Sequence, residues 1–308
     1  MNKRRLGRLL LGFLSALPKK YPIRTQGDPP DPFFIINAGR SGSTLLNRLL
    51  NQHSAAFLPP EQYFLHNLII KFQLYNWMLW RDLGKVLAGE LVSSLGAHAW
   101  EWDYEKTFRD IVLAEGEDRS LRRIVDKVIR DYAVQTGASP AFWGDTTPLN
   151  AQYINELFSV YPKAKYIFLV RDGRDVVASY QGGSHEVHQG LSEHVECAKH
   201  WRDVARVYRW LEKRGAALRL VKYEDLVADT STVMAGIVDF LGLDGESLDT
   251  NKVDVPDIPF YALPHHEELR KPIHDQRIGR WKSILSAQQL DQIMPILERP
   301  MKDFDYLG

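Results

Sequence analysis

The sequence has almost no cysteine, no excess of charge and no long apolar run. Cys197 is the only cysteine among 308 residues, so the chain can form neither an internal disulfide nor a cysteine-based zinc site. We therefore expect a reducing compartment and a cytoplasmic location. Lys+Arg and Asp+Glu balance at 39 each, which argues against a general nucleic-acid-coating protein but allows local sites for small anions.

The N-terminal segment differs from the rest of the chain. Its apolar run, residues 9–17, is too short to span a bilayer, which needs ~20 apolar residues. Residues 1–20 contain no acid, and their leucines share one face of a helix. Such a segment contacts a membrane peripherally, packs on the folded domain as a helix, or is a frayed tail. Its basic residues are Lys3, Arg4, Arg5, Arg8, Lys19 and Lys20. Prolines then mark a linker, so we divide the chain into this segment, 1–31, and one domain, 32–308.

The spacing of apolar residues indicates an α/β fold. Strands are predicted over 33–37, 165–170 and 218–223, with helical periodicity between them. This alternation is typical of a central parallel sheet flanked by helices. Residues 62–135 are rich in aromatic residues and predict a helical insertion beside the sheet. Its Trp and Tyr residues between 75 and 104 either line an acceptor pocket or form core, and core is the commoner role.

A glycine-bearing loop follows the first strand and leads into a helix. Backbone N–H groups at a helix N-terminus bind phosphate, and Ser43 and Thr44 add hydroxyl donors. The loop is not a Walker A motif, because Gly42 stands where that motif has its lysine. Its cation is Arg40, whose planar guanidinium suits a phosphate or sulfate group. The alternative is an ordinary turn with a surface arginine.

A second loop of the same kind follows the strand 165–170. Arg171 ends that strand, and Ser179 comes eight residues later on the next predicted helix. Both side chains can face one ligand if the helix folds back over the strand. We expect Asp172, Arg174 and Asp175 to shape the turn and cap the helix.

Four motifs in order resemble those of the sulfotransferases that use 3′-phosphoadenosine 5′-phosphosulfate (PAPS). They are RSGSTLL at 40–46, Arg171 with Ser179, KYEDL at 222–226 and IGRWK at 278–282. The resemblance implies a P-loop-like fold in which Arg40, Ser41, Gly42, Ser43 and Thr44 hold the 5′-phosphosulfate. It also implies that Arg171 and Ser179 bind the 3′-phosphate. Arg280 and Trp281 would line the nucleotide in a closing segment, where His265 and Lys271 are weaker candidates.

The chain resembles most closely the branch that contains protein-tyrosine sulfotransferases and many bacterial relatives. The resemblance implies that Glu61, 21 residues after Arg40, is the general base. Otherwise Glu61 is a solvated loop residue, and His53 and His66 are rival bases. The chain departs from the family at Thr146, which stands where relatives often have a lysine. Arg40 would then stabilise the leaving group alone or with another basic residue.

The sequence thus predicts in-line transfer of a sulfuryl group from PAPS to a hydroxyl acceptor, with 3′-phosphoadenosine 5′-phosphate as the product. The acceptor could be a carbohydrate, a lipid, a phenol or a protein tyrosine. We expect no metal, because no Walker-type ligand set is present. We expect no nucleic-acid partner. Two alternatives stay open: a P-loop-type nucleotide kinase or hydrolase, and a non-catalytic, membrane-associated binding module.

Overall fold

The computed structural model describes residues 18–94, 100, 102–181, 193–243, 248–249 and 272–307. The chain divides into two compact units. One, which we call the helical unit, comprises 1–31, 59–141 and 153–162; the other, the sheet unit, comprises 32–58, 142–152 and 163–308. A division by contacts does not decide whether the units fold independently, so the single domain over 32–308 stays a prediction.

The sheet unit contains a parallel five-stranded sheet, as the sequence predicted. The strand order is β2-β3-β1-β4-β5, and every neighbouring pair is parallel. The first strand is completely buried at the middle of the sheet, which explains its unbroken apolar sequence. The strands are β1 (Phe33–Ile36), β2 (Ala56–Phe57), β3 (Phe142–Asp145), β4 (Lys165–Val170) and β5 (Ala217–Lys222).

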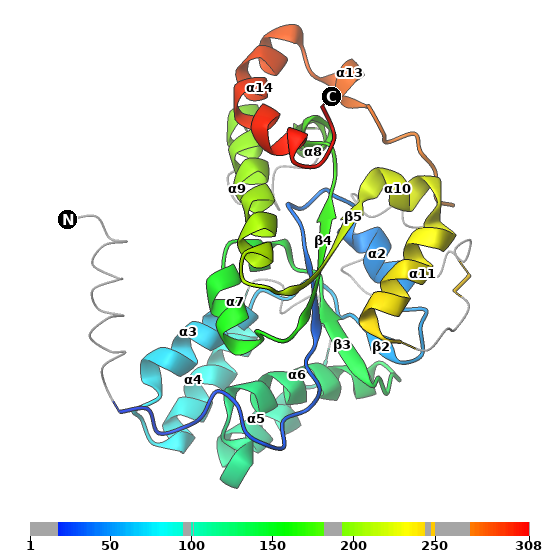
Figure 1. Cartoon of the computed structure of the whole chain (residues 1–308). Coiled ribbons are helices and arrows are strands. Elements are labelled where there is room, and N and C mark those ends of the chain that lie inside the picture. Colours follow the sequence, from blue (N-terminus) through cyan, green and yellow to red (C-terminus); the bar gives the residue numbers. More distant parts are fainter. Residues whose placement is uncertain are drawn as a thin grey trace, which may run out of the picture. The chain divides into compact units, whose positions relative to one another are not determined.

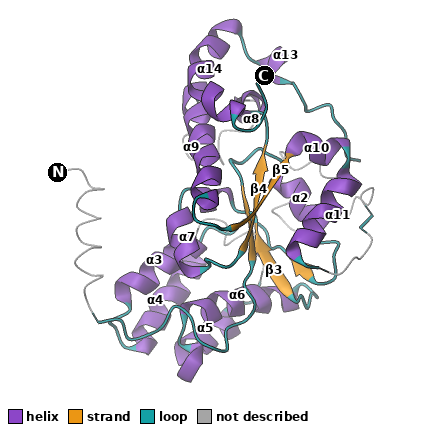
Figure 2. Ribbon diagram, in the orientation of Figure 1, coloured by secondary structure: helices purple, strands orange, loops and turns teal. Residues whose placement is uncertain are grey.

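Helices cover both faces of this sheet (Figures 1 and 2). On one face lie α2 (Ser43–Leu50), α10 (Tyr223–Ala228) and α11 (Thr230–Leu241). On the other lie α8 (Gly173–Gln181), α9 (His194–Glu212) and α14 (Ala287–Lys302). Alternate residues of β4 serve the two faces: Ile167 packs in the core with α2 and α11, and Phe168 stacks on Phe304 at 5.8 Å. A short helix, α13 (Trp281–Ile284), and a 3₁₀ turn, η3 (Pro148–Ala151), complete the unit.

The helical unit confirms the helices expected over residues 62–135. Trp80 and Trp100 are almost completely buried, so they belong to its core rather than to an open pocket. Trp100 packs against Tyr132 with ring centroids 4.4 Å apart. The elements are α3 (Leu65–Tyr75), α4 (Trp80–Ser93), α5 (Glu105–Leu113), η2 (Gly116–Asp118), α6 (Leu121–Gln135) and α7 (Ile154–Val160).

The proline-rich residues 18–31 pack along the helical unit. The buried guanidinium of Arg122 pairs with Asp31 at 2.7 Å and donates to the carbonyl oxygen of Pro29. Residues 1–17, which carry most of the predicted amphipathic segment, lie outside the described residues. Within the described part of the chain, no helix is both long and apolar enough to cross a membrane.

Candidate functional site

The loop between β1 and α2 has an unusual backbone. Gly39, Arg40 and Gly42 all have positive φ, at 70°, 51° and 93°. Glycine adopts this region without strain, whereas an arginine there is uncommon. Gly42 is the N-cap of α2 and has no side chain to cap it, and the first turn of α2 contains no acidic residue. The N-terminus of α2 therefore keeps its N–H groups and positive dipole end for an anion.

Both glycines of this loop are also required by space. A Cβ atom at Gly42 would lie 2.5 Å from the ring of Tyr223. A Cβ atom at Gly39 would lie 2.5 Å from the hydroxyl oxygen of Tyr180. The loop is therefore enclosed by two tyrosines that come from α10 and α8.

Hydrogen bonds from neighbouring side chains hold the backbone of this loop in place. The side chain of Asn37 accepts from the N–H of Gly39 at 2.8 Å and donates to the carbonyl oxygen of Thr146 at 3.1 Å. The carbonyl oxygen of Ala38 accepts from the hydroxyl of Tyr180 at 2.7 Å, and Nε2 of His200 lies 3.1 Å from it. Burial lowers the pKa of His200, which favours the neutral ring as donor. The loop is thus held in one conformation before any ligand arrives.

The structure brings the arginine of the first loop to the serine predicted from the second. Nε of Arg40 donates to Oγ of Ser179 at 3.1 Å. Nη1 of Arg171 donates to the carbonyl oxygen of Arg40 at 3.1 Å. Because β1 and β4 are parallel neighbours, their following loops meet at the carboxyl edge of the sheet, where ligands of such sheets bind.

Arg171 is buried at the centre of this cluster. Its exposed fraction is 4%, and its guanidinium lies 4.6 Å from the ring centroid of Tyr223. Among the described residues, its Nε atom has no hydrogen-bond partner. Oδ2 of Asp175 lies 3.8 Å from Nη2 of Arg171. A buried donor without a partner, on a permanently charged side chain, fits an anionic ligand such as phosphate.

Asp175 binds the C-terminal segment instead of only capping its own helix. Its carboxylate is 1% exposed and accepts from the backbone N–H of Gly279 at 2.7 Å and of Trp281 at 2.9 Å. The guanidinium of Arg174 lies 4.2 Å from the ring centroid of Trp281. The predicted closing segment is therefore fixed beside the second loop, with Trp281 partly buried and Arg280 exposed.

A second, partly buried carboxylate supports the same turn. Glu224 accepts from the N–H of Asp172 at 3.0 Å and from the hydroxyl of Tyr306 at 2.6 Å. Burial raises the pKa of Glu224, although both hydrogen bonds oppose that effect. Glu224 thus links the turn after β4 to the C-terminal end of the chain, which is a structural role.

Thr146 is buried behind the first loop. Its carbonyl oxygen accepts from Asn37, and its hydroxyl oxygen accepts from Asn47 at 3.4 Å. Thr146 therefore supports the loop and provides no cation.

The candidate bases differ in what surrounds them. Glu61, in the helical unit, is partly buried and accepts from the hydroxyl of Tyr63 at 2.7 Å. His53 is buried, and its Nδ1 accepts from the N–H of Ala55 at 3.1 Å. His66 stacks on Tyr153 with centroids 4.2 Å apart, and burial lowers its pKa. His66 thus has a stacking contact and His53 a local hydrogen bond.

Two contacts of the first loop were not foreseen from the sequence. Tyr180 and His200 both contact the carbonyl oxygen of Ala38. Tyr223, which belongs to the KYEDL motif, has its ring beside Gly42. His265 and Lys271 lie outside the described residues. The described part of the chain contains no group of three or more His, Cys, Asp or Glu side chains that could hold a metal ion.

Comparisons with known proteins identify the family and the fold. Residues 32–247 match the model of the sulfotransferase family. Two solved structures share the fold: the sulfotransferase domain of the Synechococcus PCC 7002 olefin synthase (TM-score 0.58, 23% identity, covering 91% of this chain and 98% of that one) and that of the curacin biosynthetic pathway (TM-score 0.55, 19% identity, 88% and 99%).

A curated relative is also similar in sequence. It is an uncharacterized protein of Aquifex aeolicus (strain VF5), 20% identical over an alignment of 302 positions that covers 92% of this chain. This chain spans about a third of that relative's length (34%).

Proposed function

The chain belongs to the sulfotransferase family, and from this premise we propose that it transfers the sulfuryl group of PAPS to a hydroxyl acceptor. The cluster of Arg40, Arg171 and Ser179 carries the proposal. It joins two strand-to-helix loops, and it presents two guanidinium groups beside a helix N-terminus. A nucleotide with phosphate at both its 5′ and 3′ positions needs two such anion sites.

Different residues of the cluster would bind the 5′ group and the 3′-phosphate of the donor. The N–H groups of Gly42, Ser43 and Thr44 and the guanidinium of Arg40 would hold the 5′ group, with Ser41 shaping the loop through its bond to the carbonyl oxygen of Gly39. Arg171 and Ser179 would hold the 3′-phosphate.

The closing segment supplies the rest of the donor site. Arg280 and Trp281 would line the nucleotide from that segment, which Asp175 already fixes in place. PAPS supplies the sulfuryl group and a leaving phosphate.

Catalysis would then depend on positioning and charge. Arg40 would stabilise the negative charge that develops on the leaving oxygen. Glu61 would take the proton from the acceptor hydroxyl, and the hydrogen bond from Tyr63 would orient its carboxylate. A variant with Glu61→Gln should keep its affinity for 3′-phosphoadenosine 5′-phosphate and lose most turnover, about 10²–10⁴-fold.

The deciding experiment is calorimetric binding of 3′-phosphoadenosine 5′-phosphate in the absence of magnesium. The folded wild type should bind in the micromolar range. Arg40→Ala and Arg171→Ala should each weaken binding by about 1–3 kcal/mol, because each removes charge-assisted hydrogen bonds. Arg206→Ala is the matched control, since Arg206 is an exposed arginine of the same unit.

Two outcomes would contradict the proposal. A folded wild type that fails to bind this nucleotide has no donor site. A wild type that binds ATP only with magnesium is instead a kinase or hydrolase. The acceptor would be sought with labelled PAPS and a panel of carbohydrate, lipid, phenolic and tyrosine-peptide hydroxyls. A cytoplasmic location, with peripheral membrane contact through residues 1–20, remains part of the proposal.

A further inference from the structure

The turn between α3 and α4 exposes two large apolar side chains. Trp77 is 43% exposed and Leu79 is 68% exposed, whereas Trp80, the next aromatic residue, is buried. Large apolar side chains gathered at a turn cost solubility unless they serve a contact. The turn belongs to the helical unit, whereas Arg40, Arg171 and Ser179 belong to the sheet unit.

The N-terminal residues 18–31 bring lysines to this turn. The N–H of Tyr21 donates to Oδ1 of Asn76 at 2.7 Å, and Nδ2 of Asn76 donates back to the carbonyl oxygen of Tyr21 at 2.9 Å. The ring of Tyr21 also packs edge-on against Trp80, with centroids 4.9 Å apart. The exposed Lys19 and Lys20 therefore lie next to the residue that precedes Trp77.

Helix α4, which follows this turn, also exposes basic side chains. Arg81 and Lys85 are exposed and four residues apart, so they share one face of the helix. Asp82, the acid nearest to them in sequence, lies 3.5 Å from Lys85. The turn and the start of α4 thus carry four exposed cations against one exposed acid.

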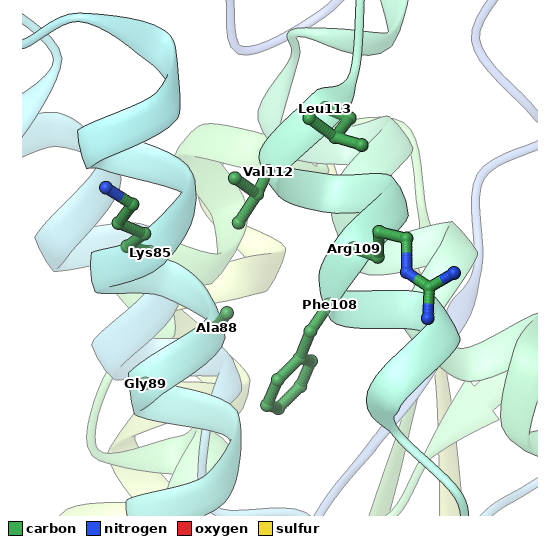
Figure 3. Close-up of a pocket in the computed structure, with 7 residues that line it drawn as sticks. All are labelled: Lys85, Ala88, Gly89, Phe108, Arg109, Val112 and Leu113. Carbon is green, nitrogen blue, oxygen red and sulfur yellow. The ribbon is translucent and has the colours of Figure 1, made fainter.

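An apolar groove adjoins this face (Figure 3). A Cβ atom at Gly84 would lie 3.0 Å from the backbone of Val112, so α4 and α5 are in close contact there. At Gly89 the same atom would meet nothing within 4 Å. The helices therefore separate along α4 and leave a groove of about 480 Å³, into which Phe108 projects. It is lined by Lys85, Ala88, Gly89, Phe108, Arg109, Val112 and Leu113.

We propose that this surface, made of Lys19, Lys20, Trp77, Leu79, Arg81, Lys85 and the adjoining groove, binds an anionic lipid bilayer. Tryptophan favours the boundary between headgroups and acyl chains, and leucine inserts below it. Each lysine or arginine near an anionic membrane adds attraction. The composition favours lipid over a protein partner, because lysine is depleted at protein interfaces.

Leu79 gives a test with a closely matched control. The full-length chain would be sedimented with vesicles of phosphatidylcholine alone and of phosphatidylcholine with 20% phosphatidylglycerol. Leu79→Glu should weaken binding to the anionic vesicles at least tenfold. Val134→Glu should leave binding unchanged, because Val134 is equally exposed (67%) in the same unit but lies on α6. Raised salt should weaken wild-type binding.

A second readout reports Trp77 directly. The chain has eight tryptophans, so the fluorescence of Trp77→Phe is subtracted from that of the wild type, with and without vesicles. The difference spectrum should shift to shorter wavelength on anionic vesicles. Affinity for 3′-phosphoadenosine 5′-phosphate should be equal in all variants, which separates this proposal from the transferase proposal.

Three results would overturn the inference. The wild type could bind neither kind of vesicle. Leu79→Glu could bind as tightly as Val134→Glu, which would leave residues 1–17 as the only contact. The wild type could also bind both kinds of vesicle equally, which would exclude a role for the cations.

Discussion

Nε of Arg40 donates a hydrogen bond to Oγ of Ser179 across 139 positions of sequence. The contact exists because β1 and β4 are parallel neighbours, so the loops that follow them meet at one edge of the sheet. It makes the direction of the Arg40 guanidinium depend on a residue of α8. We therefore expect the two predicted anion sites to be coupled.

The first prediction concerns this coupling. Ser179→Ala should weaken binding of 3′-phosphoadenosine 5′-phosphate by about 1 kcal/mol, roughly fivefold, because one hydrogen bond is lost. Combined with Arg40→Ala, the effects should not add, since each variant removes the same contact. Calorimetry on the two single variants and the double variant measures this. Ser93→Ala, at an exposed serine of α4, is the control. Strict additivity would show that the two sites act independently.

The second prediction concerns the closing segment. Asp175→Asn removes one of the two acceptor oxygens that hold the N–H groups of Gly279 and Trp281. The backbone amides of residues 277–281 should exchange with deuterium at least tenfold faster, and nucleotide affinity should fall with them. Asp291→Asn, at an exposed position of α14, should change neither quantity. Exchange as slow as in the wild type would mean that other contacts hold this segment.

The third prediction separates strain from steric clash in the first loop. Gly42→Ala introduces both, because φ is 93° and the ring of Tyr223 is too close. Gly137→Ala introduces strain alone, because φ is 81° and nothing lies within 4 Å. Denaturant unfolding should show a loss of about 1 kcal/mol for Gly137→Ala and a clearly larger loss for Gly42→Ala. Equal losses would show that Tyr223 moves aside easily.

Part of the sheet could be predicted because its strands β1 and β4 are buried on both faces. Residues 33–36 and 165–170 have no alternating polar positions, and such runs bounded by glycine loops indicate parallel strands. The two loops could be predicted for a related reason. A loop with positive φ values and a backbone in close contact with its neighbours requires glycine. Gly39 and Gly42 therefore mark the position of this loop in the sequence.

The contacts between distant elements could not be predicted in this way. Nothing in the local sequence shows that Asp175 holds the backbone of Gly279, or that Tyr180 and His200 share the carbonyl oxygen of Ala38. A carboxylate in the first turn of a helix looks like a cap whether or not it binds another segment. Such roles depend on tertiary packing, which short-range pattern does not encode.

The last prediction concerns pH and the partly buried carboxyl of Glu224. Burial holds its folded pKa above the ordinary value, so the folded state keeps a proton that the unfolded chain has already released. Stability from this group is therefore complete below the ordinary glutamate pKa of about 4.3 and is lost as the pH rises through the folded pKa.

Glu224→Gln removes this titration while retaining groups that can bond to Asp172 and Tyr306. Relative to the wild type, the variant should gain thermal stability as the pH rises from 4 to 8. Asp225→Asn, at the neighbouring exposed carboxylate, should follow the wild type at every pH. Parallel melting curves for Glu224→Gln and the wild type across this range would mean that the hydrogen bonds from Tyr306 and Asp172 outweigh burial and keep Glu224 ionised.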